Sequence, residues 1–223
     1  MVSVIGEILP LAIGVAISPI PIIAAILMLL SPKAKSTSVA FLVGWIFGIV
    51  VAVVVFTLLS SVLPQDEAGA PSPAAGVIKI VLGLLLLVVA LRQWRGRPAE
   101  GEQGALPKWM SAIDSMTPVK GLALGFLLAA VNPKNLLLAG SAGLIIGSAQ
   151  LTFGEDAVVV IIYTLLAGCT VLIPVIAYLV ASARMREPLE KLRRWLVGNN
   201  ATIMAVLLLV IGASMIGKGL GSF

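Results

Sequence analysis

The most informative pattern in this chain is the length and spacing of its apolar runs. A helix needs roughly 20 predominantly apolar residues to cross the hydrocarbon core of a bilayer. Six runs come close to or exceed that length, at residues 4–30, 39–63, 74–91, 119–146, 156–181 and 202–217. The pattern predicts an all-α, polytopic integral membrane protein with six transmembrane helices.

Prolines and polar side chains interrupt the first and fourth runs, in the segments "ISPIPII" and "AVNPKNLL". Proline removes a backbone donor and frees the carbonyl one turn earlier. A freed carbonyl is costly in hydrocarbon unless it lines a cavity or meets a partner. A simple kink explains either break alone, but two breaks in corresponding positions favour a substrate-binding site. The predicted substrate-binding residues are Ser18, Pro19, Pro21, Asn132, Pro133, Lys134 and Asn135.

The break positions also predict which carbonyls are freed. They are those near Ala129 and Ala130 in the fourth run, and near Val15 and Ile17 in the first. Lys134 adds a positive charge beside them. A charged residue deep in a membrane usually faces the bundle interior or water, and the alternative is snorkelling to the surface. An inward-facing Lys134 suits an anionic group such as a phosphate, sulfate or carboxylate.

The basic residues follow a strict alternation between loops. Lysines and arginines gather in the loops after the first, third and fifth runs, whereas the other two loops carry acidic residues instead. Lysine and arginine mark cytoplasmic loops. We therefore expect a bacterial cytoplasmic membrane protein with both termini outside.

The long third loop divides the chain into a first three-helix repeat (1–91), a cytoplasmic linker (92–118) and a second three-helix repeat (119–223). Within the linker, "PKWMSAIDSM" is expected to form a short amphipathic helix at the membrane surface. Three helices per half means that the second half inserts upside down relative to the first. The two halves are therefore predicted to be inverted-topology repeats with broken helices 1 and 4.

Composition narrows the class of function further. The chain has 223 residues, of which 60% are hydrophobic and 11% charged, with a net charge of +5, no histidine and one cysteine. No metal site, cofactor or catalytic centre is expected. The apolar runs contain almost none of the side chains that serve as a catalytic nucleophile, a general base or a metal ligand. There is no Walker-type phosphate loop, so ATP is not the expected direct driver. Nucleic acid is not an expected partner, because the positive charge is a topology signal.

Three charged residues are candidates for coupling or for a gate. Glu7 is the acidic residue within an apolar run, and Lys79 and Lys218 lie near the expected outer ends of the third and sixth runs. Glu7 could pair with either lysine for structure alone. It could also form a gate, or accept protons in a coupled transporter.

Several segments together resemble one known family. They are "ISPIPIIAAILMLLSPKAKS", "FLVGWIFG", "LPKWMSAIDSMTP", "AAVNPKNLLLA" and "LRRWLVGNN". The chain resembles the GAP family, the glycopeptidolipid- and sulfolipid-addressing proteins of the lysine-exporter superfamily. The resemblance covers nearly the whole chain and implies two inverted three-helix units. It also implies export, in some members delivery of complex lipids to the surface of bacteria with lipid-rich envelopes.

Three functions fit these observations. The first is an exporter that moves an anionic or glycosylated envelope lipid, or its precursor, across the cytoplasmic membrane by alternating access. The second is an exporter of a small soluble solute such as an amino acid, which the same motifs would serve. The third is an accessory scaffold for a larger lipid-export complex. Membrane lipids are expected partners in each case, and the assemblies considered are a homodimer and a complex with a larger lipid exporter.

Overall fold

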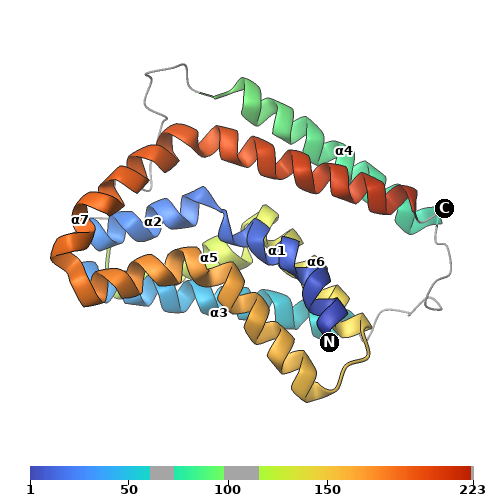
Figure 1. Cartoon of the computed structure of the whole chain (residues 1–223), viewed down its shortest axis with the longest axis horizontal. Helices are drawn as coiled ribbons and strands as arrows, with labels where there is room; N and C mark the ends of the chain where they lie inside the picture. Colours follow the sequence, from blue (N-terminus) through green and yellow to red (C-terminus); the bar gives the residue numbers. More distant parts are fainter. Residues whose placement is uncertain (61–72, 98–115, 222–223) are drawn as a thin grey trace. The chain divides into compact units, whose positions relative to one another are not determined.

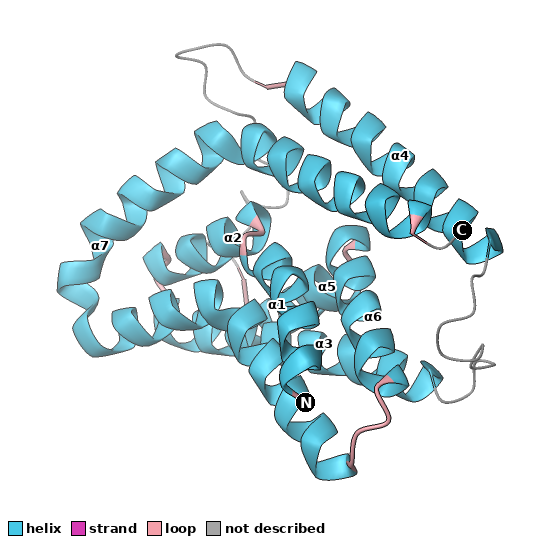
Figure 2. Cartoon of the chain, turned by 45° about the vertical axis from the view of Figure 1, so that its right-hand side comes forward, coloured by secondary structure: helices cyan, strands magenta, loops and turns pink. Residues whose placement is uncertain are grey.

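The computed structural model describes residues 1–60, 73–97 and 116–221, and within these ranges the ordered elements are helices (Figure 2). The first four are α1 (Val2–Ala16), α2 (Pro19–Leu30), α3 (Ala34–Ser60) and α4 (Pro73–Arg95). They are followed by α5 (Pro118–Ala130), α6 (Pro133–Ser148) and α7 (Phe153–Leu220). The all-α prediction is therefore confirmed for the described residues.

Several of these helices are long and apolar enough to cross a membrane. In the described residues there are three, namely α3 and the two parts of α7, Phe153–Ser182 and Arg184–Gly217. The count rises to five if each bent pair, α1 with α2 and α5 with α6, crosses as one span. These helices indicate a multi-pass membrane protein. The six predicted spans are not confirmed, because α4 covers the third predicted run without being among these candidates.

α7 contains one interruption. Ala181 has φ −140° and ψ 52°, which is not helical, so the two parts of α7 meet there at a kink. The basic stretch between the fifth and sixth predicted runs is itself helical, since residues 184–201 belong to α7. Ion pairs one helical turn apart stabilise this stretch: Glu187 with Lys191 and Glu190 with Arg193.

The chain forms two compact units, each with elements from both halves of the sequence. Unit 1 comprises Met1–Pro64 and Pro107–Arg193, and unit 2 comprises Gln65–Leu106 and Arg194–Phe223. Unit 1 therefore holds α1, α2, α3, α5, α6 and the first part of α7 (Figure 1). Unit 2 holds α4 and the last part of α7. The division of the chain into repeats at residues 91 and 119 stays a prediction.

Glycines set the packing of α3 in unit 1. On the α5 side, a Cβ added to Gly121 or Gly125 would overlap the backbone carbonyls of Thr37 or Phe41. On the α6 side, a Cβ on Gly143 would overlap Val53 in the same way. Small residues let transmembrane helix backbones approach closely. α3 is therefore packed tightly against the two halves of the second bent pair.

Large side chains fill the remaining interior of unit 1. Trp45 and Phe41 of α3 and Tyr163 of α7 are almost fully buried. A Cβ on Gly168 would collide with Ile46, which shows that the first part of α7 packs on α3. The predicted amphipathic helix "PKWMSAIDSM" lies almost wholly outside the described residues.

Candidate functional site

The first helix break lies between α1 and α2, which meet at a bend of 52°. α1 ends at Ala16, and α2 begins with Pro19 after Ser18. Proline suits the first turn of a helix, where its missing N–H would have no helical partner. Ser18 is extended, with φ −86° and ψ 108°, so the chain changes direction at this residue. Pro19 and Pro21 are both buried in the first turn of α2.

The second break, between α5 and α6, has the same local design and bends by 62°. α5 ends at Ala130, and α6 begins with Pro133 after Asn132. The side-chain oxygen of Asn132 accepts a hydrogen bond from the backbone N–H of Lys134 at 3.1 Å. Asparagine is a preferred residue at this N-terminal capping position. Asn-Pro therefore ends one helix and starts the next.

The two breaks meet through Lys134. Its ammonium nitrogen, Nζ, donates to the backbone oxygen of Gly14 at 2.8 Å and to Ser18 Oγ at 2.6 Å. Only 9% of Lys134 is exposed. The side chain therefore points inward toward the end of α1 rather than out of unit 1.

A second chain of hydrogen bonds runs through Asn135. Ser18 Oγ donates to Asn135 Oδ1 at 3.0 Å, and Asn135 Nδ2 donates to the backbone oxygen of Leu128 at 2.9 Å. Ser18 and Asn135 are 3% and 1% exposed. Each of these polar groups is thereby satisfied inside the protein, as an apolar environment requires.

The last four carbonyls of α1 all have donors, although a helix end leaves them without helical partners. The N–H groups of Ile17 and Ser18 reach the carbonyls of Ile13 and Val15. The Lys134 ammonium donates a hydrogen bond to the Gly14 carbonyl, and the hydroxyl of Thr170 in α7 donates to the Ala16 carbonyl at 2.6 Å. The second half of the chain therefore completes the end of α1. A positive charge there also interacts favourably with the helix dipole.

The carbonyls bonded by side chains at the breaks lie within one residue of those named from the sequence. They belong to Gly14 and Ala16, on either side of Val15, and to Leu128, next to Ala129. The small offset arises because each helix ends three positions before its proline, at Ala16 and Ala130, so the unpaired carbonyls are set by the helix end. Sequence reasoning missed Thr170 altogether. A hydroxyl in the apolar run "LLAGCTVLIP" was its only signal.

Electrostatically, the site is a buried cation without an acidic partner among the described residues. The described ion pairs join Glu187 to Lys191 and Glu190 to Arg193, and neither includes Lys134. Dipoles alone balance its charge, namely the Gly14 carbonyl and the Ser18 hydroxyl. An ammonium has three N–H donors, so one remains for a further acceptor.

The predicted coupling residues lie elsewhere. Glu7 is exposed on α1, where its carboxylate accepts a hydrogen bond from Ser3 at 3.5 Å. Lys79 and Lys218 belong to α4 and α7 in unit 2, and their side chains fall outside the described structure. Pairing of Glu7 with either lysine stays a prediction. In the described part of the chain, no group of three or more acidic or cysteine side chains is arranged to hold a metal ion.

Comparison with known proteins gives one family for this arrangement. The family described as Sap, sulfolipid-1-addressing protein, matches residues 8–221 of the chain. The match includes both helix breaks and both compact units. No curated protein and no solved structure matches the chain.

Proposed function

Because the chain belongs to the sulfolipid-1-addressing protein family, we propose that it is a membrane exporter of an anionic envelope lipid or its precursor. The family description links the chain to the addressing of a sulfated lipid, and the apolar helices fit a protein that works within a membrane. The proposal assigns transport, rather than catalysis, to the junction of the two helix breaks.

Buried Lys134 is the observation that carries the proposal. Burying a charge is costly unless it is paired and hydrogen-bonded, and no carboxylate pairs with Lys134 among the described residues. A sulfate ester or phosphate would supply the opposite charge together with several acceptor oxygens. The N-termini of α2 and α6 begin at the same junction. Helix N-termini favour anions through their free N–H groups and their dipole.

The hydrogen bonds suggest how binding could drive alternating access. In the described state, Lys134 ties α6 to the end of α1 through Gly14 and Ser18. A lipid headgroup that accepts the hydrogen bonds of Lys134 would break its bonds to Gly14 and Ser18. The breaks would then become hinges, because neither α1–α2 nor α5–α6 is continuous there. The energy for net export would come from a gradient, a partner protein or the lipid's own concentration difference.

The proposed topology follows the charge pattern of the loops. The protein would lie in a bacterial cytoplasmic membrane with both termini outside, and α4 would supply a sixth crossing. Each half contains a bent pair, then a long helix, then another helix, in the order α1–α2, α3, α4 and α5–α6 followed by the two parts of α7. This order supports inverted repeats. A homodimer or a complex with a larger exporter would be compatible with it.

A lipid-localisation experiment tests the function. A deletion strain would be restored with wild type, Lys134→Ala, or the control Lys120→Ala, which alters an exposed lysine in the first turn of α5. Surface lipids and total lipids would be extracted separately, and secreted amino acids measured in the same cultures. The proposal expects one anionic lipid to be lost from the surface but kept inside the cell. Wild type and Lys120→Ala should restore it, and Lys134→Ala should not.

Two other outcomes would overturn the proposal. Unchanged surface lipids with a small solute accumulating inside the cell would make the protein a solute exporter. Full restoration by Lys134→Ala would indicate an accessory scaffold, because a scaffold has no need of the buried charge.

A further inference from the structure

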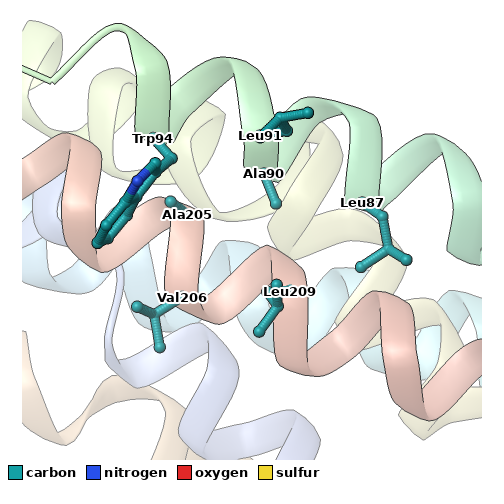
Figure 3. A pocket seen from close by; sticks show the side chains of 7 residues that line it. All are labelled: Leu87, Ala90, Leu91, Trp94, Ala205, Val206 and Leu209. Atoms are coloured by element: carbon teal, nitrogen blue, oxygen red, sulfur yellow. The ribbon is translucent and has the colours of Figure 1, made fainter.

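Unit 2 contains an apolar groove that the proposed transport site does not use. It lies between α4 and the last part of α7 and has a volume of about 430 Å³ (Figure 3). That volume is within the range of roughly 300–1,000 Å³ typical of small-molecule sites. The groove is lined by Leu87, Ala90, Leu91, Trp94, Ala205, Val206 and Leu209.

The shape of the groove follows from residue size along the two helices. Leu87, Ala90, Leu91 and Trp94 are spaced to form one stripe on α4. Farther along, the helices approach closely, since a Cβ on Gly83 would meet Gly212 and Ile216. At the other end, Trp94 reaches across to α7 beside the small Ala205 (Figure 3). The glycine contacts and the indole therefore leave a space between them.

Positive charge gathers at the Trp94 end. The guanidinium of Arg97 lies over the Trp94 ring, 4.1 Å from its centre. Arg92 and Arg95 are in the last turn of α4, and all three arginines are exposed. The described residues of unit 2, 73–97 and 194–221, include no aspartate or glutamate. Within these described ranges, the groove is thus an apolar channel with a basic end that no acidic side chain neutralises.

We propose that this groove binds an anionic phospholipid of the surrounding membrane, with an acyl chain along the groove and the phosphate at Arg92, Arg95 and Arg97. An amphiphile with a negative head matches both features at once. Basic pockets between transmembrane helices are known to bind anionic headgroups. A second copy of the chain, aligned in parallel, would bring a second set of arginines to the same end. Like charges would oppose that occupant.

Quenching of Trp94 fluorescence tests the site directly. The probe protein would keep Trp94 and carry Trp45→Phe, Trp109→Phe and Trp195→Phe. It would be reconstituted in phosphatidylcholine vesicles that contain a minor fraction of brominated phosphatidylglycerol or brominated phosphatidylcholine. A basic residue near a membrane surface contributes about 1 kcal/mol of attraction to anionic lipid, which is roughly a fivefold change in binding. We therefore expect phosphatidylglycerol to occupy the groove at least fivefold more strongly.

Two further variants assign the preference to the arginines. Arg92→Gln/Arg95→Gln/Arg97→Gln should remove the preference for phosphatidylglycerol. Arg184→Gln/Arg186→Gln, which removes two exposed arginines of unit 1, should keep it. If Trp45→Phe prevents folding, mass spectrometry of the intact wild-type and triple-glutamine proteins would compare retention of the two lipids. Higher retention of phosphatidylglycerol by wild type alone is the expected result.

Three results would overturn the assignment. Equal quenching by both brominated lipids would mean that bulk lipid fills the groove without selection. An unchanged preference in the triple-glutamine variant would place the anionic headgroup elsewhere. Stronger displacement by a sulfated glycolipid than by unlabelled phosphatidylglycerol would assign the groove to a sulfated glycolipid instead of a phospholipid. None of these results depends on whether the protein transports lipid, so the two proposals can fail separately.

Discussion

Lys134 Nζ lies 2.6 Å from Ser18 Oγ, although the two residues are 116 positions apart in the chain. Each belongs to a helix break that begins a new helix with proline. The contact joins the first and second halves of the sequence at their two helix breaks. The buried Lys134 charge and the Ser18–Asn135 hydrogen bond therefore hold the two breaks together.

The first prediction separates the effect of Lys134 on protein stability from its effect on lipid transport. Lys134→Met should leave thermal unfolding in detergent unchanged or raise its midpoint, because removing the cost of a buried charge, unpaired among the described residues, offsets the loss of the hydrogen bonds to Gly14 and Ser18. Surface delivery of the anionic lipid should fall at least tenfold, because a hydrogen bond to a charged group contributes about 1.5–3 kcal/mol. A lower midpoint together with normal delivery would contradict both parts.

The second prediction concerns competition for the Lys134 charge. Ser18→Asp places a carboxylate beside Nζ and should form an ion pair that competes with an anionic headgroup. Surface delivery should therefore fall even though Lys134 is retained. Ser18→Asn, of similar size but neutral, should deliver more lipid than Ser18→Asp when the surface lipids of both strains are compared. Equal delivery by the two variants would argue against an anionic ligand at Lys134.

The third prediction compares two threonines on α7. Thr170→Val removes the hydrogen bond to the Ala16 carbonyl and should lower the free energy of unfolding by about 1 kcal/mol. The control is Thr164→Val, because the buried Thr164 hydroxyl has no hydrogen-bond partner in the part of the chain that the structure describes. That change should be neutral or stabilising. Reversible denaturant unfolding of both variants in detergent measures the difference, and the opposite order would show that the Ala16 contact contributes nothing.

The fourth prediction tests the close packing of α3 and α5. A methyl group on Gly125 would overlap the backbone of Phe41 and Trp45, so Gly125→Ala should destabilise the protein by about 1–3 kcal/mol. Gly154→Ala is the matched control, since nothing lies within 4 Å of its added Cβ. Alanine has a higher helix propensity than glycine, so the control should be neutral or slightly stabilising. Similar thermal shifts for both variants would rule out the proposed overlap.

The helical class and the positions of the breaks could be predicted from local pattern. Apolar runs of membrane-spanning length predict helices wherever they occur. Pro19 and Pro133 locate the starts of α2 and α6, because proline is favoured at the first position of a helix, where its missing N–H would have no helical partner. The sequence placed the basic residues of 184–201 between the fifth and sixth runs, but only the structure shows that this stretch is helical and contains ion pairs. These pairs form between residues three and four positions apart, a spacing that composition does not reveal.

The sequence by itself determined that this is a helical membrane protein with two proline-containing breaks, because length, hydropathy and proline act locally. Only the tertiary structure decided that Lys134 bonds Gly14 and Ser18, that Asn135 reaches Leu128, and that Thr170 completes the end of α1. These contacts depend on the relative placement of helices from both halves of the chain. Glycine-mediated packing places α5, α6 and the first part of α7 on α3, and no single segment encodes that packing alone.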